Sequence, residues 1–328
     1  GKIVKTIQIN TIEGFRIGHA QDAEGMTGCT VILCGDGAAA GIDVRGGGPA
    51  SRETELLKPV AGADYIHALL LSGGSAFGLD AAGGVMAYLL KQGIGFDTGV
   101  AKVPLVCSSC LFDLQVGKLL WPDRAMAAAA CEDAQKNECR HGNVGAGMGA
   151  TVGKFGGTET MMKSGLGVKA VAIGKFKMGA VVAVNALGDI FDPDTGKELA
   201  GMLNPGRTAF QNTEEAMYQS IAPVQNLFTG NTTIGAVLTN ARFSKTALTK
   251  IAAMAQNGLA RTIRPVHTMA DGDSVYALAS GQVDVDINVA GTLAARVMAD
   301  AIKDAVCSAQ PVKGLKTARD LMKQKREK

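Results

Sequence analysis

The chain has 328 residues and a net charge of +3, with 47% hydrophobic and 19% charged residues. This composition excludes an intrinsically disordered chain and a coiled coil, and the length fits one large domain or two ordinary ones. Glycine is in excess at 43 residues. The glycines follow no triplet period, so they indicate tight turns and close backbone approaches, and collagen is excluded.

Charge is distributed unevenly along the chain. Residues 311–328 hold seven basic and two acidic side chains, a charge of +5, which leaves −2 for residues 1–310. Because residues 1–310 carry no excess of positive charge, we do not expect the protein to bind nucleic acid. We also expect no signal peptide and no membrane span, because no apolar run has the required length. Together with an odd count of seven cysteines, this predicts a cytoplasmic chain with reduced thiols.

The first half of the chain predicts strands separated by glycine turns, followed by helices. In chain order, the predicted elements are strands at 30–34, 39–44 and 66–71 and helices at 76–92 and 122–137. The first two strands are expected to form a hairpin around the turn Gly35-Asp36-Gly37.

The second half predicts further strands and helices around a polar segment. The predicted elements are strands at 168–173, 180–184, 232–239 and 274–279 and helices at 245–256 and 288–306. Asn257-Gly258 is expected to end the first of these helices. Residues 190–230 contain three prolines and show weak periodicity, so we expect this segment to be functional or mobile. The mixture of elements predicts a layered α/β or α+β fold.

Two motifs suggest cofactor or metal sites that their context does not support. Residues 145–150 match a loose G-x-G-x-x-A, but no acidic residue follows where a dinucleotide site needs one, and Gly153-Lys154 lacks the Ser or Thr of a P-loop. Cys107-Ser-Ser-Cys110 is expected to consist of buried small residues, since the remaining cysteines and scattered histidines form a poor set of zinc ligands. We therefore expect no cofactor and no metal.

Two hydroxyl residues are candidate nucleophiles. Ser75 lies between a predicted strand and helix, but Phe77 replaces the last glycine of a nucleophile elbow, so we expect Ser75 to cap the helix through its hydroxyl. Thr232 begins a strand directly after the polar segment. Cleavage of the bond between Asn231 and Thr232 would give Thr232 a free α-amine with a reference pKa of about 7.7–8.0, which can accept the proton of the adjacent hydroxyl.

Eight stretches with distinctive residues lie in order over most of residues 14–300. They are FRIGHA (15–20), DVRGGGPASRETELL (43–57), LSGGSAFGLDAAGGVMAYL (71–89), VPLVCSSCLFDL (103–114), GNVGAGMGATVGK (142–154), VNALGDI (184–190), GNTTIGAVLTNA (230–241) and PVHTMADGDSVYALASG (265–281). As a set they resemble the self-cleaving aminopeptidase family typified by DmpA, an L-aminopeptidase/D-esterase, with relatives among the β-peptidyl aminopeptidases. These are N-terminal-nucleophile hydrolases.

The resemblance implies a four-layer αββα sandwich, in which two stacked sheets lie between helix layers. It also implies a single domain over residues 1–328 that cleaves itself between Asn231 and Thr232 into chains 1–231 and 232–328, which stay associated. Thr232 would then be the N-terminal nucleophile. Homo-oligomers, tetramers or larger, are implied as well.

Three further residues receive roles from the resemblance. Asn185 matches an asparagine that donates a hydrogen bond to the oxyanion, although on sequence alone an Asx-turn at a strand end fits equally well. Asp271 and Asp273 match polar or acidic side chains that orient the nucleophile and its amine, whereas Asp271-Gly272 alone also predicts a turn between strands.

The leading expectation is an aminopeptidase that removes the N-terminal residue of short peptides, amides or esters through an acyl-enzyme on Thr232. Its partners would be these small substrates, with no nucleic acid and no membrane. Two alternatives stay open. One is an acyltransferase of the ornithine acetyltransferase type, which shares self-cleavage before threonine. The other is a non-catalytic binding protein that retains the fold.

Overall fold

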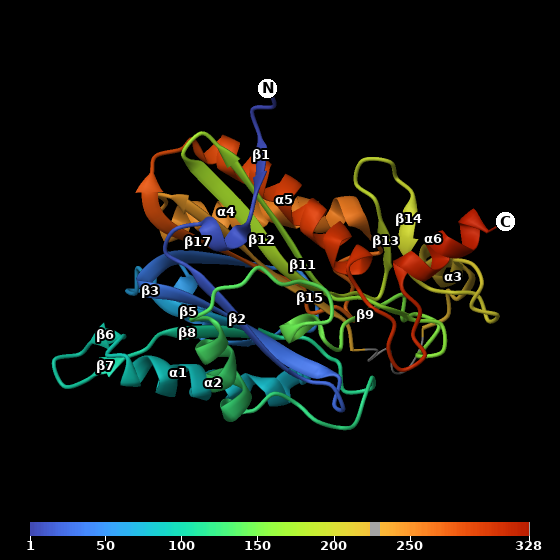
Figure 1. The fold of residues 1–328 in the computed structure, drawn as a ribbon, viewed down its shortest axis with the longest axis horizontal. Coiled ribbons are helices and arrows are strands. Elements are labelled where there is room, and N and C mark those ends of the chain that lie inside the picture. The colour runs from blue at the N-terminus through green and yellow to red at the C-terminus, as the bar shows by residue number, and fades with distance from the viewer. Residues whose placement is uncertain (224–229, 328) are drawn as a thin grey trace.

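The structure, a computed structural model, describes residues 1–223 and 230–327. Its main strands form two stacked sheets that share β3 (Figure 1). In spatial order, the first sheet contains β1 (Lys5–Ile7), β11 (Leu166–Ile173), β12 (Phe176–Asn185), β15 (Thr232–Ala241), β17 (Ser274–Val283) and β3 (Thr27–Val44). The second contains β2 (Arg16–Asp22), β3, β5 (Ile66–Ser72), β8 (Val106–Cys110) and β4 (Ala50–Arg52).

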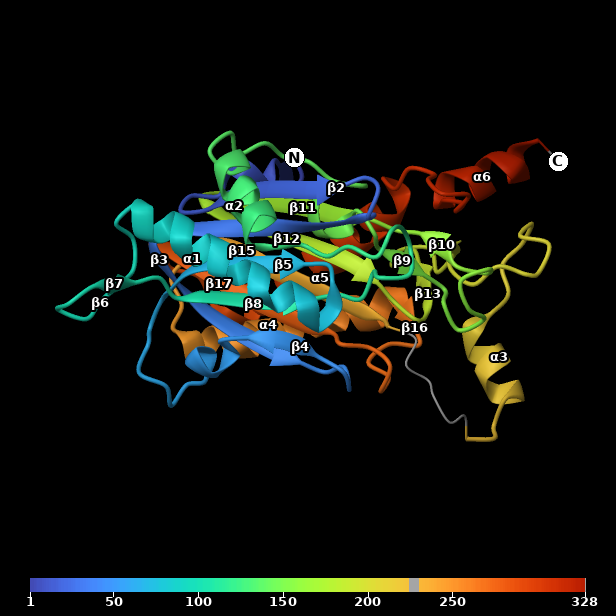
Figure 2. The same ribbon diagram turned by 90° about the horizontal axis from the view of Figure 1, so that it is seen from below.

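Helices cover both outer faces of the stacked sheets. α1 (Ala82–Lys91) and α2 (Arg124–Asp133) lie on the second sheet, and α4 (Lys245–Thr262) and α5 (Ile287–Cys307) lie on the first (Figures 1 and 2). α3 (Thr213–Gln219) and α6 (Ala318–Arg326) lie beyond one end of the sandwich. The short strands are β6 (Phe96–Asp97), β7 (Lys102–Val103), β9 (Thr151–Val152), β10 (Met162–Lys163), β13 (Asp189–Phe191), β14 (Glu198–Ala200) and β16 (Ile263–Arg264). No helix in the described part of the chain is both long and apolar enough to cross a bilayer.

Three apolar cores separate the four layers. Along β12, Met178, Ala180 and Val182 face α4 and α5, whereas Val181 and Ala183 face the second sheet, as the two-residue period of a strand requires. A third core lies between the second sheet and helices α1 and α2. The predicted αββα sandwich is therefore confirmed.

The predicted hairpin at residues 30–44 is wrong, because β3 runs through it as one bent strand. Its pairing with β5 shifts register between Leu33 and Ala38. Gly35 and Gly37 take positive φ angles of 57° and 135°, which allow the strand to bend from one sheet into the other. The glycine signal marks a corner between the sheets, where we expected a turn.

Two predicted helix boundaries also need correction. Ser75 opens a 3-10 helix, η3 (Ser75–Ala81), that leads into α1, but its N-cap is Gly74 and no side chain caps it. Asn257-Gly258 does not end α4, which continues to Thr262. A Cβ on Gly258 would lie 2.7 Å from the carbonyl oxygen of Ala295 in α5. This glycine therefore permits close approach of the two helices.

The polar segment at 190–230 contains β14 and α3 and is anchored to the sandwich by the buried Asp189. The Oδ1 atom of Asp189 accepts hydrogen bonds from the Met202 amide at 2.9 Å and the Thr213 hydroxyl at 2.7 Å, and Oδ2 accepts from the Thr213 amide at 2.8 Å. Much of the segment is thus built into the fold. Residues 224–229, which the prediction also covers, lie outside the described residues.

Gly167 on β11 provides a direct test of this packing. A Cβ there would lie 1.8 Å from the carbonyl oxygen of Ala301 in α5. Gly167→Ala should displace the helix and lower the free energy of unfolding by about 1–3 kcal/mol, as overpacked cores do. Gly206→Ala is the matched control in thermal unfolding, since the nearest atom is 3.8 Å away. Equal midpoints for the two variants would contradict the close packing of α5 on β11.

Candidate active site

One end of the sandwich brings together strand ends from both sheets. In the first sheet β12 ends at Asn185, and the neighbouring strands β15 and β17 begin at Thr232 and Ser274. In the second sheet β8 ends at Cys110, and the segment that follows reaches across to the first sheet, since Asn185 Nδ2 donates to the Phe112 carbonyl oxygen at 2.8 Å. Residues predicted separately from the sequence therefore meet at one place.

The candidate nucleophile Thr232 is buried, with 4% of its surface exposed, and is joined to Asn231, so the structure describes the uncleaved chain. Asn231 extends β15 by a parallel bridge to Asp271. The carbonyl oxygen of Asn231 accepts a hydrogen bond from the Gly272 amide at 3.0 Å and also contacts Thr232 Oγ1. A hydroxyl and a backbone donor therefore lie at the carbonyl group of the bond predicted to be cut.

Gly272 has to be glycine for this arrangement. A Cβ on Gly272 would lie 2.6 Å from Thr232 Oγ1 and 2.6 Å from the carbonyl oxygen of Gly48. The absence of a side chain allows the Gly272 amide to approach the 231–232 peptide while the loop at Gly48 packs on its other side.

Of the two predicted aspartates, Asp273 holds the backbone next to Thr232 and Asp271 holds the loop at Thr268. Asp273 Oδ1 accepts from the Thr233 amide at 2.9 Å, and Asp271 Oδ2 accepts from the Thr268 hydroxyl at 2.5 Å. Burial raises the pKa of Asp271, and the nearby Asp273 carboxylate raises it further. These residues do not form the turn between strands that the dipeptide alone suggests, because they continue the parallel pairing of β17 with β15.

Asn185 lies directly opposite Thr232 in the antiparallel pair formed by β12 and β15. Its Oδ1 accepts from the Thr151 amide at 3.0 Å, and one Nδ2 hydrogen goes to the Phe112 carbonyl oxygen. These partners are 34 and 73 residues away, so the side chain links three segments and forms no local Asx-turn. The structure thus brings Asn185, Thr232, Asp271 and Asp273 together at one end of the sandwich.

Lys154 belongs to this site, and sequence reasoning missed it. Its buried Nζ donates to the carbonyl oxygens of Asn185 at 3.2 Å and Gly230 at 3.3 Å. Burial lowers the pKa of Lys154 to about 7, although Asp271 and Asp113 oppose the shift. A lysine that is partly neutral at pH 7 can accept a proton. The only sequence signal for this role is a lone lysine at the end of a run of small and apolar residues, where Gly153-Lys154 fails the P-loop pattern.

The glycine run at 142–157 positions Asn185, and no helix follows it as in a phosphate-binding loop. It wraps around a second buried lysine, Lys163, whose Nζ donates to the carbonyl oxygens of Gly147 at 2.9 Å and Ala150 at 3.2 Å. The next residue, Thr151, begins β9 and supplies the amide that holds Asn185.

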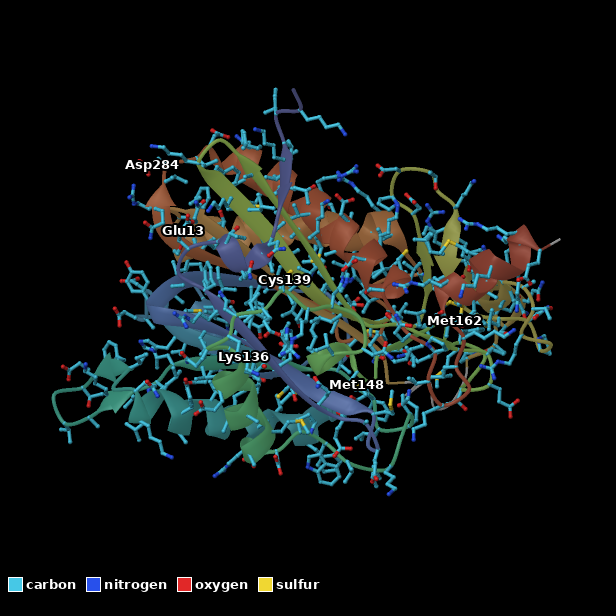
Figure 3. The ribbon with its side chains drawn as sticks, in the orientation of Figure 1. Glu13, Lys136, Cys139, Met148, Met162 and Asp284 are labelled. Atoms are coloured by element: carbon cyan, nitrogen blue, oxygen red, sulfur yellow. The ribbon has the colours of Figure 1, made fainter. Side chains whose placement is uncertain are left out.

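The C-x-x-C motif is buried in β8, as expected for small core residues. Cys107 and Cys110 are 0% and 2% exposed, and their odd spacing in a strand directs the thiols to opposite faces. All seven cysteines are unpaired, and Cys139 is exposed (Figure 3). Within residues 1–223 and 230–327, no three potential metal ligands gather as a group.

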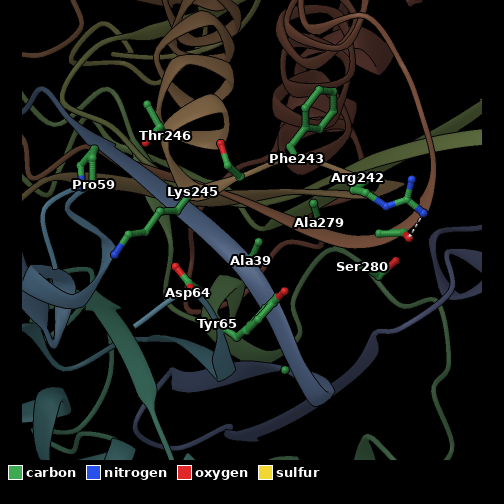
Figure 4. Close-up of a pocket in the computed structure, with 13 residues that line it drawn as sticks. Ala39, Pro59, Asp64, Tyr65, Arg242, Phe243, Lys245, Thr246, Ala279 and Ser280 are labelled. Atoms are coloured by element: carbon green, nitrogen blue, oxygen red, sulfur yellow. Dashed lines mark hydrogen bonds between the residues drawn. The ribbon is translucent and has the colours of Figure 1, made fainter. Parts of the chain in front are cut away.

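A cavity of about 460 Å³ lies at the opposite end of β15 and β17, next to Tyr65, Arg242 and Lys245 (Figure 4). Its cationic groups already have partners: Lys245 Nζ donates to three backbone carbonyl oxygens, and Arg242 pairs with Asp284 at 2.6 Å. β15 spans ten residues, so the cavity is about 30 Å from Thr232. It is not part of the candidate site.

Comparison with known proteins identifies the family. The profile of peptidase family S58 matches residues 8–319. The chain belongs to this family. An uncharacterized aminopeptidase of Mycobacterium tuberculosis is 36% identical over 95% of this chain and 97% of its own length. A 6-aminohexanoate-oligomer endohydrolase of Kocuria sp. is 32% identical over 89% of this chain and 84% of its own length.

A solved structure gives the fold independently. The L-aminopeptidase D-Ala-esterase/amidase of Ochrobactrum anthropi, described as a variant of the Ntn hydrolase fold, matches this S58 chain with a TM-score of 0.68. The match covers 98% of this chain and 93% of that one at 13% identity. The predicted resemblance is confirmed, and the names of the relatives identify the S58 chain as a hydrolase of the peptidase type.

Lys154 provides a stability test that does not depend on catalysis. An unfolded lysine has a pKa of about 10.4, whereas the folded value is about 7. Between these values the unfolded chain binds more protons, so the free energy of unfolding should rise with pH from about 7 to 10. Lys154→Met should reduce that rise, measured by urea unfolding of a chain that also carries Thr232→Ala.

The matched control for this experiment is Lys136→Met, at an exposed lysine labelled in Figure 3. It should leave the pH dependence of the unfolding free energy unchanged. If Lys154→Met behaves like this control, Lys154 remains charged in the folded chain and cannot be the neutral group described above.

Proposed function

We propose that this S58 member is an amide hydrolase that activates itself by cutting the Asn231–Thr232 bond and then uses Thr232 as its N-terminal nucleophile. The observation that carries the proposal is the contact of Thr232 Oγ1 with the Asn231 carbonyl oxygen, which also accepts the Gly272 amide at 3.0 Å. This combines a hydroxyl nucleophile with a preorganised oxyanion donor at a single carbonyl group.

In the proposed self-cleavage, neutral Lys154 takes the proton of Thr232 Oγ1 as that oxygen bonds to the Asn231 carbonyl carbon. The Gly272 amide stabilises the oxyanion that forms. The carbon–nitrogen bond then breaks, and the Thr232 nitrogen leaves as an amine with the proton returned by Lys154. Water hydrolyses the resulting ester and frees the Thr232 hydroxyl. The position of Lys154 Nζ, on the carbonyl oxygens of Gly230 and Asn185, supports this role.

In the proposed mature enzyme, the Thr232 amine replaces Lys154 as the base for the Thr232 hydroxyl. Asp273 keeps the nucleophile oriented through the Thr233 amide, and the role that we assign to Asp271 is to orient the new amine. Gly272 and Asn185 would donate to the oxyanion of the substrate carbonyl. One such donor contributes about 2.7–4 kcal/mol to stabilisation of a tetrahedral intermediate.

The substrate class that we propose is short peptides, amides or esters with a free N-terminal residue, in line with the aminopeptidase names of the relatives. A second candidate is internal cleavage of oligomers of an ω-amino acid, favoured by the 32% identical 6-aminohexanoate-oligomer endohydrolase. Both reactions pass through an acyl-enzyme on Thr232.

Replacement of Thr232 tests the whole proposal. Intact-mass spectrometry of the purified wild-type chain should show two species, residues 1–231 and 232–328, and Thr232→Ala should show one uncleaved chain without hydrolytic activity. Thr232→Ser, which keeps a hydroxyl on the same carbon, should still be cleaved. A wild-type chain that stays intact while hydrolysing amides would refute the proposed nucleophile, and an intact, inactive chain would favour a binding protein.

Substrate assays of the cleaved enzyme separate the candidate activities. Aminoacyl p-nitroanilides should be hydrolysed if the enzyme is an aminopeptidase, whereas N-acetylated 6-aminohexanoate oligomers should be cut only by an endohydrolase. A chelator should leave the rate unchanged, because the proposed mechanism uses no metal. Transfer of acetyl groups from acetylornithine to glutamate, without amide hydrolysis, would instead indicate an acyltransferase.

A further inference from the structure

The loop between α4 and β17 places a histidine against the carboxylate of Asp273. His267 Nδ1 lies 2.8 Å from Asp273 Oδ2, and the His267 amide donates to the same oxygen at 3.1 Å. The other oxygen, Oδ1, accepts from the Thr233 amide at 2.9 Å. Asp273 therefore connects His267 to the peptide group that follows Thr232.

The connection is buried and leaves the carboxylate little freedom. The side chain of Asp273 is 2% exposed and that of His267 is 18% exposed. A buried carboxylate depends on protein donors, because water cannot replace them. With Thr233 on one oxygen and His267 on the other, the carboxylate cannot turn without losing a hydrogen bond. The direction of the Thr233 amide is fixed as a result.

Backbone conformation alone does not account for histidine at position 267. The residue has a φ of +60°, in the left-handed region that glycine and asparagine adopt more readily. Nε2 is buried and has no hydrogen-bond partner among the described residues. The ring therefore acts through Nδ1, which must carry the proton in order to donate to the carboxylate.

We propose that His267 is a positioning residue for the Thr232 nucleophile and acts through Asp273. This inference rests on the proposed function, in which Thr232 attacks both its own peptide bond and the substrate. Loss of the ring donor would release one side of the carboxylate and allow the Thr232–Thr233 peptide to shift. A misplacement of about 1 Å can slow a reaction by about 100-fold. The effect should fall on kcat and leave KM nearly unchanged, because the ring makes no contact with substrate in this scheme.

Two substitutions separate the hydrogen bond from the backbone conformation. Glycine and asparagine both suit the left-handed φ, but only asparagine places an N–H near the position of Nδ1. His267→Gly should slow self-cleavage and lower kcat by about 10- to 100-fold, with KM within about 3-fold of wild type. His267→Asn should restore both rates to within about 3-fold of wild type. Self-cleavage is followed by intact mass, and hydrolysis is normalised to the cleaved fraction.

A matched control exists elsewhere on the chain. His141 Nδ1 also lies 2.7 Å from an aspartate oxygen, that of Asp304, but the side chains of this pair are more exposed, at 53% and 26%. His141→Asn should leave self-cleavage, kcat and KM unchanged. If His267→Gly fails to fold, His267→Gln takes its place. Glutamine carries the same amide as asparagine but one bond farther from the backbone, so self-cleavage and hydrolysis should both remain slow in this variant.

Wild-type rates in His267→Gly would overturn the inference. The inference would also be overturned if His267→Asn were as slow as His267→Gly while the two variants had equal thermal midpoints, because the side-chain donor would then be irrelevant. Where His267→Gln replaces His267→Gly, the same comparison is made with His267→Gln. Failure of the proposed function has a different signature. In that case Thr232→Ala would retain activity, or the wild-type chain would keep its full-length mass, whatever residue occupies position 267.

Discussion

The hydrogen bond from the Gly272 amide to the Asn231 carbonyl oxygen is the contact on which the site depends. It exists because β15 and β17 are parallel neighbours, so one further bridge between Asn231 and Asp271 carries the pairing past the ends of both strands. Gly272 has no side chain to keep the two segments apart. The antiparallel pairing with β12 then places Asn185 on the other side of Thr232. The sheet itself therefore aligns these groups.

Burial sets the protonation chemistry at this end of the sandwich. It lowers the pKa of Lys154 to about 7 and raises the pKa of Asp113 to about 6, because a low-dielectric interior disfavours the charged form of each group. Burial also raises the pKa of Asp271. An amine and a carboxyl thus both have pKa values near neutral pH, so each of them can gain or lose a proton there.

The sequence predicted most elements and a layered mixed fold, since strand and helix periods are local signals, and the αββα order of the layers followed from the resemblance. The beginning of β15 at Thr232 was predicted from the β-branched residues at 232–239, whereas the roles of Asn185, Asp271 and Asp273 followed from motif resemblance. Lys154 and His267 were missed for a physical reason: Lys154 meets Gly230 across 76 residues, and the position of His267 depends on a loop with left-handed backbone. The prediction was wrong for Gly35 and Gly37, which form a strand corner and no hairpin turn, and for Gly258, which permits a helix contact and does not end α4. Glycine suits all of these places, so its presence in the sequence does not distinguish them.

The strand order has a mechanical consequence for a chain cut before Thr232. β15 and β17, from the C-terminal piece, sit between β12 and β3, from the N-terminal piece, and α4 and α5 press on the same sheet. The shorter piece therefore contributes the two central strands of a sheet whose flanking strands belong to the longer piece. Its departure would require rupture of two strand interfaces and the opening of two apolar cores at once. Such a nicked molecule should melt as one cooperative body, and neither piece should refold by itself.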